Sequence, residues 1–384
     1  MISYEYKLYR SKKTRHLDDM LKEACFVWNH ALSLQKRYYR LYGKYISSAR
    51  MQKHFAKRIH RAYLHSQSVQ EVLQRLDTSY KRFFKHQAKR PPKYKKHTDF
   101  RSFVFKQGGF ILSGNVFHLN SVKKDYRFSY SRAYEGKVKQ VRLKRSPKGE
   151  WYIYIVTDAV IKPYAKTHNG ASTGIDFGLK TYMTFSNGDE LQNPQFLKHD
   201  LKKLQRLSNQ HSTKVKGSNH RERARIRLVS WHEHVSNKRK NYQWKLAHEL
   251  CRKYDYIFIE DLCLTGMARH KNWGRKMNDL AYGQFVSILE QVATKYGCVL
   301  HKIDRWYASS KLCDCGYKNE MLTLNEREWV CPQCGQIHQR DIHAAQNILR
   351  RGIYELGSES KTIEVNTKMA FHANVENEFT QESH

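Results

Sequence analysis

Acidic residues are scarce in this chain of 384 residues, because 35 Asp and Glu stand against 70 Lys and Arg, for a formal net charge of +35. Such an excess calls for a polyanionic partner, either an anionic membrane or a nucleic acid. The chain also lacks a continuous apolar stretch long enough to span a bilayer, and it has no lipidation motif. Both absences count against a membrane and favour a nucleic acid.

A secretory signal is also missing, because the opening residues MISYEYKLYR are too polar for one. We therefore expect a reducing compartment. Four of the eight cysteines cluster near the end of the chain, and the others stand singly among apolar residues: Cys25, Cys251, Cys263 and Cys298. Free thiols or metal ligands are thus expected instead of disulfides.

The chain has no internal repeat, and the spacing of its apolar residues changes along its length. Helical spacing over 17–42, 48–63 and 68–85 predicts an all-helical unit at 11–96, which the paired prolines at 91–92 bring to an end. Alternation from 100 to 161, and again in the first ten residues, predicts a small β-barrel or curled sheet formed by 1–10 and 97–168.

The third region alternates strands and helices. Strands are expected at GIDFG, at YDYIFIE and at GCVLHKID, with a hairpin at TYMTFSNGDEL. Helices are expected at 194–210, 220–254 and 279–296. This pattern predicts an α/β core with mixed strand pairing inside a multidomain α+β protein. Residues past Tyr354 lose periodicity, which predicts a mobile tail at 356–384.

Three acidic residues stand where a divalent-metal nuclease would need them: Asp176 in GIDFG, Glu260 at the end of YIFIE and Asp341 just after the cysteines. Two Mg²⁺ ions held by such carboxylates would activate water and stabilise the leaving oxygen of a phosphodiester. Each acid also has an ordinary interpretation. Asp176 suits a turn, Asp261 is an equally available neighbour of Glu260, and Asp341 suits the start of a helix.

The clustered cysteines form two close pairs, Cys313 with Cys315 and Cys331 with Cys334. Two such pairs, each followed by glycine, predict a zinc ribbon with one Zn²⁺ and four thiolates. The first pair has one intervening residue where two are usual, so His338 or Asp314 is an alternative ligand. Four thiolates leave no open position for water, which predicts a structural ion; the competing interpretation is a metal-free loop.

The expected helix at 220–254 carries a basic residue on most turns. A solvated charged face is the ordinary interpretation. Because acidic partners are lacking at the i,i+4 positions, we expect a face that follows phosphates instead. The candidate contacts are Arg221, Arg223, Arg225, Arg227, Lys238, Arg239 and Lys240.

The chain resembles the TnpB family in GIDFGLK, IEDL, SSKLCDCGYKN, REWVCPQCG and RDIHAAQNI, in family order. The resemblance implies a RuvC-like (RNase H-type) α/β nuclease domain at 169–308 and 339–355, interrupted by a zinc ribbon at 309–338. It also implies that the β-barrel is the wedge domain and the helical unit the recognition domain. By motif position, Asp176, Glu260 and Asp341 correspond to the catalytic acids, which would hold two Mg²⁺ ions.

The family is one of RNA-guided DNA endonucleases encoded by bacterial insertion sequences. The resemblance therefore implies a guide RNA from the transposon end, target double-stranded DNA with a short adjacent motif, and a monomeric ribonucleoprotein in the bacterial cytoplasm at the nucleoid. Gln70 corresponds to a reader of the DNA motif, since Gln can pair with adenine; a solvent-facing side chain is its alternative. His343 replaces a frequent Asn; a place on the helix surface is expected for it, and an approach to the metals is its alternative.

Barrel tyrosines are candidates for stacking on guide bases, although most are expected in the core: Tyr126, Tyr130, Tyr152 and Tyr154. Two rival functions remain open. A guided DNA-binding repressor would not cleave, and the intact acids argue against it. A strand-transferring transposase would need transposon ends and no RNA.

Overall fold

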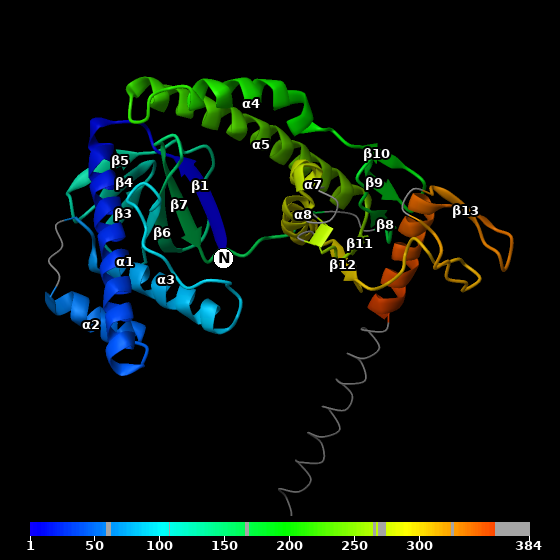
Figure 1. Ribbon diagram of the computed structural model, residues 1–384, viewed down its shortest axis with the longest axis horizontal. Helices are drawn as coiled ribbons and strands as arrows, with labels where there is room; N and C mark the ends of the chain where they lie inside the picture. Colours follow the sequence, from blue (N-terminus) through cyan, green and yellow to red (C-terminus); the bar gives the residue numbers. More distant parts are fainter. Residues whose placement is uncertain are drawn as a thin grey trace, which may run out of the picture. The chain divides into compact units, whose positions relative to one another are not determined.

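The computed structural model describes residues 1–58, 63–106, 108–165, 169–263, 266–267, 274–323 and 326–357. The chain divides into two compact units, residues 1–161 and 162–384 (Figure 1). The predicted helical segment and the predicted β-sheet segment up to residue 161 fall in the first unit, and the predicted nuclease and ribbon segments fall in the second. Within the described ranges, no helix combines the length and the apolar character needed to cross a bilayer.

Three helices lie in the first unit, close to the predicted ranges: α1 (Arg15–Tyr42), α2 (Ser48–Arg58) and α3 (Ser66–Phe84). α1 buries one face, because Leu17, Leu21, Ala24 and Trp28 recur every three or four residues. It ends at Gly43, which has a φ of 61° and whose N–H donates to the Tyr39 carbonyl at 2.8 Å. All three predicted helices are present, although residues 59–62 of the predicted range 48–63 lie outside the described residues.

The strands of the first unit form two antiparallel sheets. One has the order β1 (Ile2–Lys7), β7 (Trp151–Thr157), β6 (Val138–Arg145) and β2 (Ser102–Phe105). The other joins β3 (Phe110–Ser113), β4 (Val116–Leu119) and β5 (Lys124–Arg127). A bridge between Leu8 and Phe128 links them, but in the described residues they do not close into one continuous barrel. Side chains of both sheets share a single hydrophobic core with α1 and α3.

The second unit is built on a five-stranded sheet in the order β10 (Glu190–Gln192), β9 (Thr181–Phe185), β8 (Ser172–Asp176), β11 (Tyr256–Glu260) and β12 (Val299–Ile303). The first three strands pair antiparallel and the last three pair parallel. The predicted hairpin and mixed pairing are therefore confirmed. β8 is the central strand and has a parallel neighbour on one side only.

Alternating side chains of β11 give the sheet two apolar faces. Ile257 and Ile259 pack with α5 (Asn219–Lys253) and α8 (Tyr282–Tyr296), whereas Phe258 packs with Ile348 of a helix over residues 340–357. That last helix lies very close to the sheet. A Cβ at Gly174 would clash with the Ala345 carbonyl and the Leu349 backbone, and one at Gly352 would clash with the Phe258 ring.

One predicted helix, 279–296, is wrong in its bounds. The structure has α7 (Gly274–Leu280) followed by α8, with Ala281 between them at a φ of 48°. The buried Tyr282 explains the break, because its hydroxyl donates to the Tyr182 carbonyl at 2.9 Å and this contact fixes where α8 begins. Of the predicted tail at 356–384, residues 356 and 357 are still helical and the rest lie outside the described residues.

Candidate active site and metal centre

Two of the predicted acids end adjacent parallel strands. β8 pairs with β11 up to Ile175 and Ile259, and Asp176 and Glu260 are the residues that follow. Parallel strands present the same ends at one edge of a sheet, so both carboxylates leave the sheet there. Sheet topology thus brings together residues that are far apart in sequence.

The third acid, Asp341, is the second residue of the helix over 340–357, which packs on β8 at Gly174. Burial raises the pKa of Asp176 to about 8, and the charges of Glu260 and Asp341 add to the increase, against opposing effects of Arg340 and Arg327. These two contributions require that both carboxylates lie near Asp176. The three carboxylates therefore form one electrostatic site.

Each of the other acids has a defined partner. Glu260 accepts a hydrogen bond from the buried Ser309 hydroxyl, and burial raises the pKa of Glu260 while that bond lowers it. Asp341 forms an ion pair with Arg327. Asp261, whose side chain is 49% exposed, pairs with Arg305 instead. This geometry favours Glu260 over Asp261 as the member of the acidic site.

The acidic site suits a hard divalent cation but is not a closed cage. A closed cage would bring three or more His, Cys, Asp or Glu ligand atoms within 4.8 Å of one another. In the described part of the chain, only the four cysteine thiols form such a group. Mg²⁺ keeps several waters and needs few protein ligands, so carboxylates spaced more widely still fit it. A bound cation would also offset the burial of Asp176 and the repulsion from Glu260 and Asp341, which together raise its pKa.

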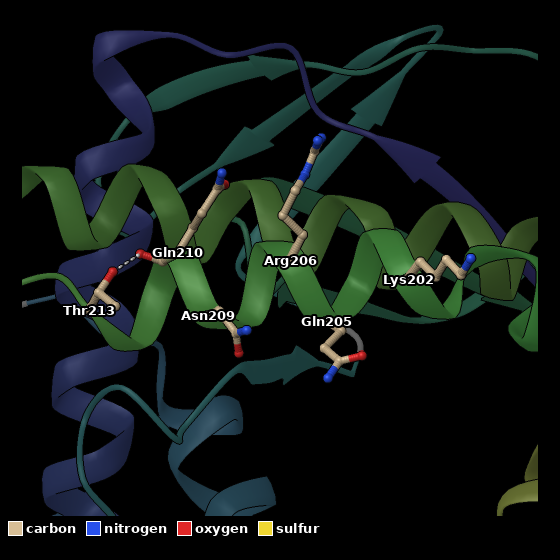
Figure 2. A pocket seen from close by; sticks show the side chains of 6 residues that line it. All are labelled: Lys202, Gln205, Arg206, Asn209, Gln210 and Thr213. Atoms are coloured by element: carbon tan, nitrogen blue, oxygen red, sulfur yellow. Dashed lines mark hydrogen bonds between the residues drawn. The ribbon is translucent and has the colours of Figure 1, made fainter.

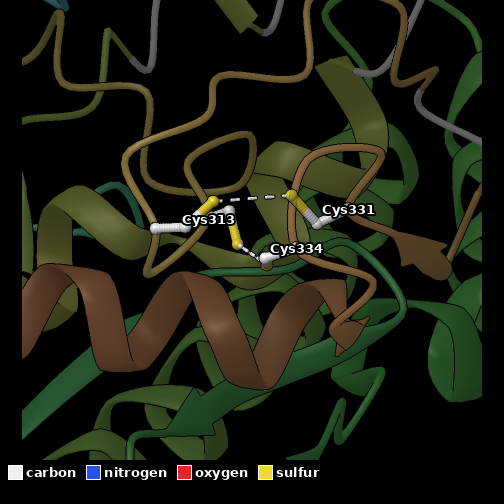
Figure 3. Close-up of side chains that lie close together, drawn as sticks. Cys313, Cys331 and Cys334 are labelled. Atoms are coloured by element: carbon white, nitrogen blue, oxygen red, sulfur yellow. Dashed lines mark hydrogen bonds between the residues drawn. The ribbon is translucent and has the colours of Figure 1, made fainter.

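The four predicted thiol ligands do converge (Figure 3). The Sγ atoms of Cys313 and Cys334 lie 3.5 Å apart, and those of Cys315 and Cys331 lie 3.6 Å apart. Four sulfurs at about 2.3 Å from a tetrahedral Zn²⁺ would be roughly 3.8 Å apart, so the cluster fits that ion. Gly316 and Gly335 follow the two pairs with φ of 90° and 72°, as the tight turns require. The short first pair is compatible with this arrangement.

Of the two alternative zinc ligands, Asp314 has another partner, whereas His338 stays next to the cluster. Asp314 pairs with Arg350 at 2.5 Å, and the His338 Nε2 lies 3.1 Å from the Cys313 sulfur, beside the four thiols. His343 is buried, not on the helix surface as expected. Its Nε2 lies 2.9 Å from the Leu312 carbonyl, and its ring is 3.9 Å from the ring of His338.

Sequence reasoning missed the side chains that join the ribbon to the last helix and to the acidic site. Asn347, only 2% exposed, donates to the Ser309 carbonyl at 2.7 Å and to the Leu312 carbonyl at 2.8 Å. Ser309 in turn donates to Glu260. Ser309 lies in SSKLC and Asn347 in AAQNI, but sequence periodicity does not predict a hydrogen bond between segments so far apart.

The predicted basic contacts are mostly paired within the chain. Arg225 pairs with Glu222 at 2.7 Å, Lys238 with Asp200 at 3.7 Å, and Arg239 donates to the Asn278 carbonyl at 2.9 Å. Arg221 donates to the Lys214 carbonyl at 2.6 Å. These partners do not lie at i,i+4 positions: one lies at i,i+3 and the others belong to neighbouring segments, which the i,i+4 pattern of the sequence does not reveal.

Other polar groups are free to meet a partner. Arg223, Arg227 and Lys240 are exposed on α5. Gln70 is exposed on α3, which leaves both interpretations of it open. Figure 2 shows exposed side chains that line a hollow on α4 (Phe196–Ser212) and that sequence reasoning did not select. They are Lys202, Gln205, Arg206, Asn209, Gln210 and Thr213.

Only one of the four candidate tyrosines is buried in the core, so the expectation that most of them lie there is not met. Tyr126 is 3% exposed and belongs to the core, so it is not a stacking residue. Tyr152 and Tyr154 are partly buried. Tyr130 is 43% exposed, although its ring already stacks on Tyr6 with centroids 5.7 Å apart.

Sequence comparison finds relatives along most of the chain. A protein of Streptomyces pristinaespiralis named "Putative RNA-guided DNA endonuclease" is 30% identical, and the alignment covers 91% of this chain and 89% of that one. Escherichia coli K12 "Putative RNA-guided DNA endonuclease InsQ" is 28% identical over 86% of this chain and 87% of its own. Family models described as "Probable transposase" and "Cas12f1-like, TNB domain" match residues 154–271 and 282–348.

Solved structures share the fold. A Cas12f1 protein in a complex with sgRNA and target DNA aligns with a TM-score of 0.57 at 16% identity, over 88% of this chain and 83% of that chain. The mini-RNA-guided endonuclease Cas_phi3 aligns with a TM-score of 0.53 at 9% identity, over 92% of both chains. At these identities the likeness supports the fold alone.

Proposed function

The chain belongs to the TnpB family, and from this premise we propose that it is an RNA-guided, metal-dependent DNA endonuclease. The observation that carries the proposal is that Asp176 and Glu260 end adjacent parallel strands at one edge of the sheet, where burial, with added repulsion from Glu260 and Asp341, raises the pKa of Asp176 to about 8. A site that collects negative charge on a chain of net charge +35 is suited to holding cations against a phosphodiester.

The three carboxylates are the proposed catalytic ligands. Two bound Mg²⁺ ions would supply an activated water and neutralise the leaving oxygen. Ser309 holds the Glu260 carboxylate in place, and Arg327 balances the charge of Asp341. The four cysteines would hold one structural Zn²⁺, which would stabilise the loop that leads into the helix of Asp341.

The proposed partners are a guide RNA derived from a transposon end and target double-stranded DNA. Two relatives are named for RNA-guided action on DNA. RNA pairing would supply the sequence specificity, and the basic surface would hold the backbones. The exposed basic residues of α5, the α4 hollow and Gln70 are the candidate contacts. We further propose that the protein and its guide RNA form a monomeric ribonucleoprotein in the bacterial cytoplasm, associated with the nucleoid.

The experiment is to purify the protein with its bound RNA, sequence that RNA, and supply plasmid DNA matching its variable end. We expect one abundant structured RNA and cutting only of the matched plasmid with Mg²⁺. Matched-plasmid binding without cutting would point to a repressor. Joining of transposon ends without RNA would point to a transposase. Either result would overturn the proposal.

A further inference from the structure

The segment after β12, residues 304–309, is fastened at two points to the strand end that carries Glu260. In the parallel pair of β11 and β12, Glu260 lies opposite Ile303, just before this segment. The Arg305 Nε donates to the Asp261 carbonyl at 2.9 Å, and its guanidinium pairs with the Asp261 carboxylate. Ser309 donates to Glu260 itself. The segment therefore lies beside the acidic site.

The backbone of this segment is well supported. The Trp306 N–H donates to the Asp304 carboxylate at 3.0 Å, and the Tyr307 N–H donates to the Asp304 carbonyl at 3.1 Å. The Tyr307 side chain packs against the core formed by Phe258, Ile303 and Ile348. The residue next to Trp306 is thus anchored, which fixes the position from which Trp306 projects.

The Trp306 side chain is 86% exposed, in contrast to Ser309 at 5%. A large apolar ring usually buries most of its surface, so this exposure is notable on a segment so firmly held. Trp306 also lines a surface hollow together with Asp261, Lys302 and Arg305. An exposed indole that lines a hollow and projects from an anchored backbone, beside the proposed catalytic acids, is placed to receive a flat ligand.

We propose that Trp306 is a stacking platform for one nucleobase of the DNA strand that is being cut. Stacking does not depend on base identity, because every base has a π face, and this suits an enzyme that takes its sequence from RNA. The fixed backbone means that little conformational freedom is lost on binding. Stacking would hold the strand so that its phosphodiester meets Glu260. The inference rests on the proposed function and adds a position for the substrate.

The direct test is photo-crosslinking in EDTA, with the protein in its complex with co-purified RNA. Matched target DNA carries 5-bromouracil at successive positions of the strand to be cut. We expect a crosslink to Trp306, identified by mass spectrometry, from one or two positions beside the scissile bond. No crosslink at Trp306 from any position would overturn the proposal. The crosslink does not require cleavage. A crosslink at Trp306 in a complex that never cuts DNA would therefore support stacking, while the absence of cutting would contradict the proposed function.

Kinetics give the second test. Loss of a base–aromatic stack should slow single-turnover cleavage by Trp306→Ala roughly tenfold, whereas Trp306→Phe should stay near the wild-type rate. Met321→Ala is the matched control, because Met321 is also 86% exposed but lies in the ribbon. Wild-type cleavage by Trp306→Ala, or equal slowing by the alanine and phenylalanine variants, would overturn the proposal. If the alanine variant melts at a lower temperature, Trp306→Gln provides the same comparison.

Discussion

At the scale of single residues, Glu260 and Asp261 are neighbours whose carboxylates have different surroundings. Glu260 ends a buried strand and is held by Ser309, whereas Asp261 pairs with Arg305 at the surface. Replacing Glu260 by Ala should reduce cleavage at least a hundredfold, because a ligand of the proposed catalytic cations is lost. Binding of guide and target should change little, and both quantities can be measured on one matched plasmid.

Asp261→Ala is the control for that substitution. Exposed ion pairs contribute about 0–1 kcal/mol, so we expect nearly normal folding and cleavage to within a few fold. If Asp261→Ala abolishes cutting and Glu260→Ala does not, the two residues have been assigned the wrong way round.

Asp176 makes stability depend on pH in the absence of metal. Its folded pKa of about 8 lies above the unfolded value of 3.8, so between these values the folded state binds the additional proton. The contribution of Asp176 to the free energy of unfolding is therefore greatest below about pH 4. It falls as the pH rises towards 8, by up to about 1.4 kcal/mol per pH unit. Melting temperatures in EDTA should show the fall, and Asp176→Asn should flatten it. Equal slopes in both proteins would contradict the raised pKa of Asp176.

Much of the acidic site was predictable because strand ends and short motifs are local signals. Asp176 and Glu260 each close an apolar strand, and the sequence shows both. Ser309, Asn347 and Arg327 were not predictable in the same way, because their partners come from other segments. The buried position of His343 was missed for the same reason, since it depends on the ribbon that covers the helix.

At the scale of elements, the contact between β8 and the helix over 340–357 depends on Gly174. A Cβ there would clash with backbone atoms of Ala345 and Leu349, which cannot turn aside as a side chain can. Gly174→Ala should therefore destabilise the second unit by about 1–3 kcal/mol, as overpacking does, and should displace Asp341. Thermal unfolding is the measurement. Gly357→Ala, with open space around its Cβ, should leave the melting temperature unchanged or slightly higher.

The ribbon should need its metal to hold its shape. Cys331→Ser or Cys334→Ser should lower the zinc content below the one ion per chain expected by elemental analysis, and should reduce both folded yield and cleavage. Cys263→Ser removes an exposed thiol outside the cluster and should do neither. Active wild-type protein without stoichiometric zinc would show that the cluster has no structural role.

Helix boundaries were predictable where the sequence has a clear capping or terminating residue. Gly43 ends α1, and Ser218 caps α5 by accepting from the Arg221 N–H at 3.1 Å. The break at Ala281 escaped prediction because apolar spacing continues across it, and only the tertiary contacts of Tyr282 reveal it. The strands of the first unit were predicted from the alternation of apolar and polar residues. Alternation alone does not specify which strands pair, so the division into two sheets was not predicted.

At the scale of the whole molecule, the net charge of +35 predicts a steep dependence of binding on salt. Each neutralised duplex phosphate contributes about −0.9 to the log–log slope. Changing Arg223, Arg227 and Lys240 together to Glu should make the slope shallower by about two to three, as measured by target binding from 50 to 200 mM salt. Reversing already paired lysines gives the same change in net charge and should leave the slope nearly unchanged: Lys22, Lys139 and Lys318. Equal effects would mean that overall charge, not this helix, sets the response.

Segments that pack together in the second unit are far apart in the sequence, and this affects the order in which the protein folds during synthesis on the ribosome. The hairpin of β8 and β9 can form early, but β11 and the helix of Asp341 arrive much later, and β8 packs against both. Units tend to fold in order of emergence, and pairings between distant segments wait for their second partner. The nascent chain therefore completes residues 1–161 while its third carboxylate has not yet been made. A protein built in this order acquires its positively charged surface before it acquires the proposed ability to cut.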